Sequence, residues 1–394
     1  MRGKGIGIPT RVKAARRRAG CASALLLLAA AGLRAEEFRL FPSGPASPRQ
    51  EWSFASRTAK LRLFDLENAE EADGIPDEFG VDALRTGGAA AATEAATPTI
   101  RRCVIFQCVN VPVGPVPPAE KVFTTPVLIW TAVTVFGGLA VGIDGPISDG
   151  FHHFHFTNEG FFQTWTYGGG ADKASHFIAT ADIAASLVDA YRLNRLTDEQ
   201  AFGLSFAATL FAGFLVEVGD GLTPYGFSKE DLTADAVGAF SGAFVHAMHL
   251  EDTIGFRLGK VPTTIPADVV GGAVFSGINY ATEIYTADLK LGGFSRRIGV
   301  DPTISRFFLL SFAFLTKGFG FMPELPQRYQ QVGVELGLNF PEILKAVGVR
   351  DSTWWGDTLL RMADFFRIPF TQIGVYYNFG NQKWYGPGAP NHFY

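Results

Sequence analysis

Three short groups of acidic and basic residues in the middle of the chain have types and spacings that could support chemistry. The first is Asp172-Lys173-Ala174-Ser175-His176, which follows three glycines at 168–170. Asp172 and His176 are four residues apart, so a helix that begins there places both on one face. A histidine oriented by a carboxylate can act as a general base. The alternative is that Asp172 caps the helix and His176 is only its neighbour.

The second group lies at the end of an apolar run, residues 200–216. Glu217 follows that run directly, and Asp220 comes three residues later. If this helix end is buried, the carboxylates need partners, because burying an unpaired charge is costly. They could then serve as an acid or as metal ligands, although the sequence indicates no particular metal. Alternatively, the helix simply ends there and both acids meet water.

The third group is a segment at 226–232 (GFSKEDL), followed by Asp235 and Gly238. Ser228 and Asp231 resemble a capping box at the start of a helix that runs to residue 250. Capping explains Asp231. It does not explain Asp235, which lies one turn further on within an apolar stretch and therefore needs a partner from elsewhere in the fold.

We expect four of these side chains to converge at one place in a helical unit, with Asp220 as a further candidate: Asp172, His176, Glu217 and Asp235. Two functions are then open. In the first, which we favour, the cluster locks the core of a non-catalytic envelope protein. In the second, the protein is a hydrolase-like enzyme acting on a lipid headgroup or cell-wall fragment. His176 would then be the base, oriented by Asp172, and Glu217 or Asp220 the acid or metal ligand.

A histidine run, His152, His153 and His155 (FHHFHF), also invites interpretation as a metal site. No acid or cysteine within the run completes a ligand set, and the interleaved phenylalanines favour a packed or interfacial segment. The sequence has no GxSxG, HExxH, P-loop or GxGxxG pattern in a suitable context. No motif indicates a cofactor or a protein partner.

The three groups together resemble the YfiM-type periplasmic lipoproteins, the uncharacterised family DUF2279, with a fainter similarity to VanZ-like membrane proteins. The resemblance rests on DKASHFIAT at 172–180, AFGLSFAATLFAGFLVEVGDG at 201–221 and GFSKEDLTADAVGAFSG at 226–242. Members show an Asp-Lys-x-x-His start, an apolar helix ending in Glu-x-x-Asp, and a Ser-x-x-Asp-Leu segment with a later Asp and Gly. We assign structural roles to four of the matching positions: Lys173, Ser228, Asp231 and Gly238.

The family has no activity to carry over, so the resemblance bears on fold and location. Longer relatives are also similar over residues 279–379. This chain has no lipobox after its N-terminal apolar run, so lipid anchoring is not implied.

Residues 1–35 are typical of a secretory signal. A basic segment precedes an apolar stretch at 22–32, which is too short to span a bilayer as a helix. We expect cleavage near Ala35 and export to the periplasm or outer membrane, with an uncleaved membrane anchor as the alternative. Export also favours a disulfide between Cys103 and Cys108, the two cysteines that remain after cleavage.

Cleavage changes the charge of the protein. Residues 1–35 hold eight of the 34 Lys and Arg and none of the 38 Asp and Glu, which leaves 26 basic residues and a net charge of −12. A surface of that sign repels phosphate backbones, so we expect no nucleic-acid partner. Charge alone also would not hold the protein on anionic lipid.

The composition divides the chain into parts. Residues 36–121 form a docking segment and a disordered linker rich in acids, Ala and Pro. Residues 122–285 form the helical, YfiM-like domain, with apolar stretches at 122–143, 200–216, 236–250 and 269–282. The stretch at 122–143 carries no charge and could be a membrane helix or a buried core helix.

Residues 286–394 change to the period-two pattern of strands. Strands are predicted at 307–314, 329–340 and 370–379, a weaker one at 286–294, and helices at 341–347 and 354–366. The fold class is therefore α+β, a compact unit of about four apolar helices followed by an antiparallel sheet or partial barrel. Late tryptophans and tyrosines, as at membrane–water boundaries, indicate a membrane partner, contacted through 122–143 or these strands.

Overall fold

The computed structural model describes residues 98–114, 117–260, 280, 283–317 and 328–388. All of them belong to one compact unit. The predicted signal sequence, most of the predicted docking segment and linker, and most of the apolar stretch at 269–282 lie outside the described residues.

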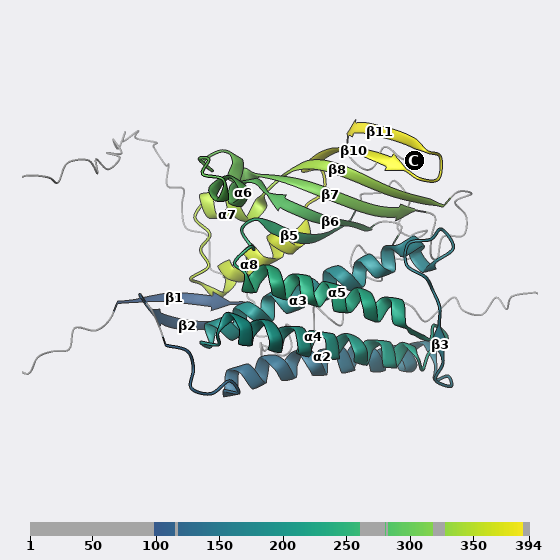
Figure 1. The fold of residues 1–394 in the computed structure, drawn as a ribbon, viewed down its shortest axis with the longest axis horizontal. Helices are drawn as coiled ribbons and strands as arrows, with labels where there is room; N and C mark the ends of the chain where they lie inside the picture. Colours follow the sequence, from purple (N-terminus) through teal and green to yellow (C-terminus); the bar gives the residue numbers. More distant parts are fainter. Residues whose placement is uncertain (1–97, 115–116, 261–279, 281–282, 318–327, 389–394) are drawn as a thin grey trace, which may run out of the picture. The chain divides into compact units, whose positions relative to one another are not determined.

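Four long helices form one layer of the fold. They are α2 (Thr125–Asp149), α3 (Ala171–Leu193), α4 (Asp198–Asp220) and α5 (Lys229–Ala247). α3 packs chiefly on α5, and α2 on α4. Figure 1 shows the helices beneath the sheet, with α3 and α5 nearer to it and α2 and α4 farther away. By length and composition α2 and α4 could each cross a membrane, a test that core helices of soluble proteins also pass.

Small residues set the distance between α3 and α5. A Cβ atom on Gly238 would overlap the carbonyl oxygen of Phe177, and one on Gly242 would overlap that of Ala181. The bundle core contains Ala184, Ala239 and Ala243, all fully buried. Helices with such faces approach closely, which brings polar groups on neighbouring helices within hydrogen-bond reach.

A seven-stranded sheet forms the second layer, in the order β11-β10-β8-β7-β6-β5-β9. Its strands are β5 (Ile254–Lys260), β6 (Glu283–Lys290), β7 (Phe308–Lys317), β8 (Tyr329–Leu338), β9 (Phe366–Arg367), β10 (Gln372–Asn378) and β11 (Lys383–Gly388). All neighbours are antiparallel except β5 and β9. The α+β fold class is confirmed, but the described strands do not form a closed barrel, because β11 and β9 are edges.

In the C-terminal third the predicted elements occur in the predicted order, including the helices α7 (Phe340–Ala346) and α8 (Trp354–Phe365). One further helix, α6 (Leu291–Arg297), and the strands β9 and β11 were not predicted. The weak strand prediction at 286–294 is wrong in its second half, where α6 begins. There Gly292 and Gly293 pack so closely on the backbones of Arg306 and Asp252 that a side chain at either position would clash. Strand β5 falls within the range predicted to be helical.

The sheet is polar on its curled inner face. Arg257 pairs with Asp288, and Arg367 pairs with Glu335, all four side chains being buried. The outward positions of β7, β8 and β10 are instead apolar and exposed. One part of the sheet is covered by α3, which contacts β5, β6 and β7.

A hairpin precedes the helices, formed by β1 (Thr99–Val104) and β2 (Gln107–Pro112). Cys103 and Cys108 face each other across it, with Cα atoms 4.1 Å apart, and are joined by a disulfide. The hairpin contacts α3 and α8. Its main chain is tied to α8 by the NH of Ile105, which donates to Asp357 Oδ2 at 2.6 Å.

Candidate functional site

The polar cluster forms where α3 begins, α4 ends and α5 begins. A tight turn, Tyr167–Gly170, leads into α3, and Gly168, Gly169 and Gly170 all have positive φ, which only glycine adopts without strain. This turn places Asp172, Lys173 and His176 in the first turns of α3. Gly238, on α5, permits the close approach of the two helices.

Lys173 is the centre of one half of the cluster. Its side chain is 1% exposed, and its Nζ lies 3.0 Å from Asp172 Oδ2 and 2.9 Å from Asp231 Oδ1. It also pairs with Glu159. A buried ammonium with three carboxylates ties α5 and the 158–166 loop to the start of α3. These three ion pairs are the contacts through which Lys173 would fulfil the structural role that we assigned to it.

Asp231 belongs to this half through its side chain and to the helix cap through its backbone. Its NH donates to Ser228 Oγ at 3.2 Å, as in the predicted cap. Asp172 has a further partner in Tyr280, whose hydroxyl donates to Asp172 Oδ1. Neither Tyr280 nor Glu159 was identified from the sequence, because nothing local to either residue marks it as a partner of α3.

His176 is the centre of the other half. Its Nδ1 lies 3.0 Å from Asp235 Oδ1 on α5 and 3.9 Å from Glu217 Oε1 at the end of α4. Glu217 is 1% and Asp235 2% exposed, whereas the imidazole is 21% exposed. The other oxygen of Glu217 accepts a hydrogen bond from the NH of Ser228 at 3.1 Å. The structure thus brings together residues that are 59 positions apart in sequence.

Asp220 lies at the end of α4, half-buried. Its main-chain oxygen accepts hydrogen bonds from the NH groups of Thr223 and Gly226, which closes the turn into α5. It stands apart from the two hydrogen-bonded halves of the cluster. Burial raises the pKa of Asp220 to about 6, although the nearby charge of His176 acts in the opposite direction.

The cluster holds more acids than cations. Burial raises the pKa of Glu217 to about 9, and burial together with the charge of Asp172 raises that of Asp231 to about 7. Burial alone would lower the pKa of His176, but the charge and hydrogen bond of Asp235 outweigh burial and raise that pKa well above its usual value. For Asp172 the charges of His176 and Lys173 outweigh burial, and its pKa is lowered.

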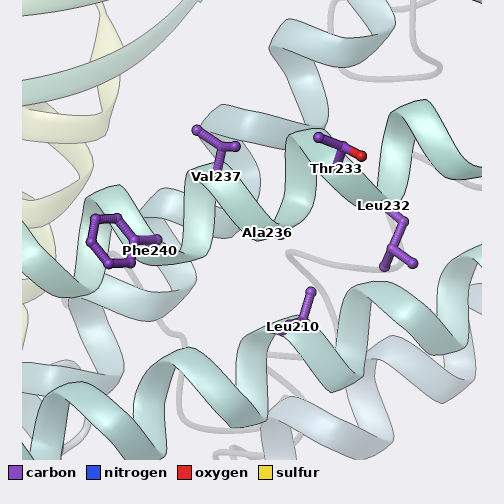
Figure 2. A pocket seen from close by; sticks show the side chains of 6 residues that line it. All are labelled: Leu210, Leu232, Thr233, Ala236, Val237 and Phe240. Atoms are coloured by element: carbon purple, nitrogen blue, oxygen red, sulfur yellow. The ribbon is translucent and has the colours of Figure 1, made fainter.

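Two cavities formed by the described residues do not open onto the cluster. An apolar groove of about 440 Å³ lies between α4 and α5, lined by Leu210, Leu232, Thr233, Ala236, Val237 and Phe240 (Figure 2). None of these residues belongs to the cluster. A smaller polar cavity is lined by residues that include Asp182, His246 and Arg361, and it does not contact the cluster either.

The histidine run does not join the cluster. His152, His153 and His155 are exposed. Among the described residues, the groups with metal-ligand spacing are Asp172, His176 and Asp231, and His176, Glu217 and Asp235. A metal ion could therefore be held only by side chains of the polar cluster, as judged from the described part of the chain.

The fold and the site define an α+β protein, in which a helical bundle with a buried acid–histidine cluster is joined to a mostly antiparallel sheet. Residues 158–247 match the family described as predicted periplasmic lipoprotein (DUF2279). The match contains every residue of the cluster that lies on α3, α4 or α5, and it confirms the family resemblance over this range. Its periplasmic description agrees with the predicted export. No curated protein and no solved structure matches the chain.

Proposed function

We propose that this exported envelope protein is membrane-associated and has a structural, non-catalytic role. The polar cluster would lock three helices together, while apolar outer surfaces lie against lipid. Residues 1–35 would be removed on export. The family match supports the envelope location. The membrane association is supported by the pattern of side chains on the sheet.

The observation that carries this proposal is a pair of exposed apolar rows across β7, β8 and β10. Strand pairing aligns Leu310 with Leu336 and Ile373 in one row, and Phe312 with Val334 and Val375 in the next. Their exposed fractions lie between 41% and 59%. Such a contiguous apolar face on a protein surface marks a site of contact with a protein or a membrane.

The inner face favours lipid over a protein partner. Between the two rows, Ser311 and Glu335 point inward, and Glu335 is fully buried with Arg367. Polar side chains inside and apolar side chains outside are typical of sheets that face hydrocarbon. Exposed Trp384, on β11, lies opposite Tyr377 at the border of these strands, as aromatics do at membrane boundaries.

The buried geometry supports the structural role. Glu217 and Asp235 are almost fully covered, so that a reacting group could reach only the partly exposed ring of His176. Their contacts join α3, α4 and α5. Removing such contacts is expected to affect folding before it affects any reaction.

Flotation with vesicles tests the membrane association. Purified protein is mixed with neutral phosphatidylcholine vesicles, so that flotation cannot result from attraction between the charges of the protein and the lipid. The double variant Phe312→Lys/Val334→Lys should reduce the floated fraction at least tenfold, since a Lys in contact with hydrocarbon costs about 2–4 kcal/mol at mid-bilayer depth.

The matched control is Val300→Lys/Val347→Lys, which changes two exposed valines outside the two rows. It should float like the unchanged protein. Equal flotation of the sheet variant, or failure of the unchanged protein to float, would contradict the proposal.

A further inference from the structure

His176 lies between two pairs of buried carboxylates, of which, in the described part of the chain, only one pair has a lysine as a counter-charge. On one side, Asp172 and Asp231 share the ammonium of Lys173. On the other side are Glu217 and Asp235, and the described residues place no Lys or Arg in an ion pair with either. One potentially charged imidazole therefore faces two carboxylates without a further cation.

Two oxygen atoms on that side have no hydrogen-bond donor among the described residues. They are Glu217 Oε1 and Asp235 Oδ2, and both are inaccessible to solvent. A buried carboxylate oxygen without a donor costs free energy, more so when the group is charged. The separation of 3.9 Å between His176 Nδ1 and Glu217 Oε1 is too long for a hydrogen bond. The imidazole therefore satisfies Asp235 Oδ1 alone.

The backbone leaves room for one of these oxygens, Asp235 Oδ2. A Cβ atom on Gly213 would lie 2.6 Å from Asp235 Oδ2, so any other residue there would displace the carboxylate. Gly213 lies in the middle of α4, where glycine is unfavourable for helix stability. Its presence is explained by the space that Asp235 needs.

We propose that His176, Glu217 and Asp235 bind a divalent transition-metal ion. Their donor atoms, one imidazole nitrogen and two carboxylate oxygens, all lie within 4.8 Å of one another. Two ligands bound at about 2.1 Å to a tetrahedral ion are about 3.4 Å apart. The distances of 3.0 and 3.9 Å from Nδ1 to the two carboxylates bracket that value. An ion can therefore enter with small side-chain adjustments.

The donor set selects the class of ion. An imidazole ligand favours Zn²⁺ and its neighbours over Mg²⁺ and Ca²⁺, which prefer oxygen. Three protein ligands leave at least one position for water, on the side where the His176 ring is partly exposed. The ion would supply the missing positive charge and join α3, α4 and α5. This inference rests on the proposed structural role and deepens it. Its test measures bound metal, whereas the test of membrane association measures binding to lipid vesicles.

The test is metal binding by the whole mature protein in detergent. Protein stripped with a chelator is titrated with Zn²⁺, and in parallel with Ca²⁺. Bound metal is counted by elemental analysis, and thermal unfolding is recorded. All samples carry His152→Ala, His153→Ala and His155→Ala, because exposed histidines bind zinc adventitiously. We expect one equivalent of Zn²⁺, a rise in Tm, and no such response to Ca²⁺.

Two variants keep the shape of the site while removing a ligand charge. Glu217→Gln and Asp235→Asn should each weaken Zn²⁺ binding at least a hundredfold. The matched control is His246→Gln. His246 is on the same helix, and its Nδ1 lies 2.9 Å from Asp189 Oδ1, but Arg361 already supplies a cation to that carboxylate. Its loss should leave zinc stoichiometry unchanged.

Less than a tenth of an equivalent of bound zinc in the unchanged cluster would overturn the proposal, whatever the membrane behaviour of the protein. So would zinc binding of unchanged affinity in Glu217→Gln. In either case the unpaired oxygens would be satisfied by water or by a proton. If a variant fails to fold, the stoichiometry of the parent protein still decides.

Discussion

Arg367 on β9 reaches Glu335 on β8, with Nη2 and Oε1 2.9 Å apart, although three strands lie between them in the sheet. The contact is possible because the sheet curls, so that Arg367 and Glu335, which both lie on its polar inner face, meet across the curve. Tyr376 on β10 donates its hydroxyl to the same carboxylate. Three strands are therefore tied together inside the curve by one buried acid.

Glu335→Ala should destabilise the protein by about 3–5 kcal/mol, because it leaves the Arg367 guanidinium buried without its counter-charge. The measurement is chemical unfolding in detergent followed by far-UV circular dichroism. Glu342→Ala serves as the comparison, since its pair with Lys345 is at the surface and should contribute less than about 1 kcal/mol. Similar costs for both substitutions would show that the inner pair is solvated.

Gly242→Val should prevent close packing of α3 on α5, because its side chain would overlap the main chain of Ala181. We expect a loss of at least about 3 kcal/mol or failure to fold. Gly203→Ala is the control: that glycine lies within α4 with open space around it. It should raise stability by about 0.5–1 kcal/mol. Melting temperatures of both variants provide the comparison.

Acid should weaken the protein through Asp189. Burial raises the pKa of this carboxyl, but the charges of His246 and Arg361 outweigh burial and hold the pKa well below its usual 3.8. The unfolded chain therefore binds a proton more readily than the folded protein does. The contribution to stability is present above pH 3.8 and is lost as the pH falls below it.

Asp189→Asn should remove this part of the acid dependence, so that stability falls less steeply between pH 4 and the acid limit. At neutral pH the same variant should be less stable, because Arg361 and His246 lose a charged partner. Unfolding free energies measured across this pH range check both effects. Parallel pH profiles for the variant and the parent would refute the assignment.

The bond between Cys103 and Cys108 closes a short loop in the β1–β2 hairpin. Replacing both with Ser should cost about 2 kcal/mol, as expected from chain entropy for a loop of this length. Mass spectrometry without reduction should first show the bridged peptide two hydrogens lighter than the dithiol. Free, alkylatable thiols in envelope-derived protein would contradict the bond.

The local parts of the fold could be predicted from the sequence. The glycines before Asp172, the Ser228 cap and the apolar runs locate α3, α4 and α5, because helix starts and hydrophobic periods depend on neighbours in the chain. The period-two pattern likewise locates β7, β8 and β10. The acids and histidine within these elements marked a polar cluster.

Which residues meet in that cluster was decided by tertiary packing. Lys173 forms ion pairs with Asp172, Asp231 and Glu159, and His176 pairs with Asp235. The contacts from α3 to α5 form because small residues let the two helices approach closely. Sequence spacing carries no information about a contact between helices this far apart in the chain.

Tertiary packing also decided which face of the sheet is buried and which is exposed. The alternation in β8 indicates one covered face, and the apolar residues would ordinarily occupy it. The structure instead buries Gln331 and Glu335 and exposes Val334 and Leu336. The period of a strand fixes which residues share a face, but what covers each face depends on how the sheet curls and on the helices packed against it.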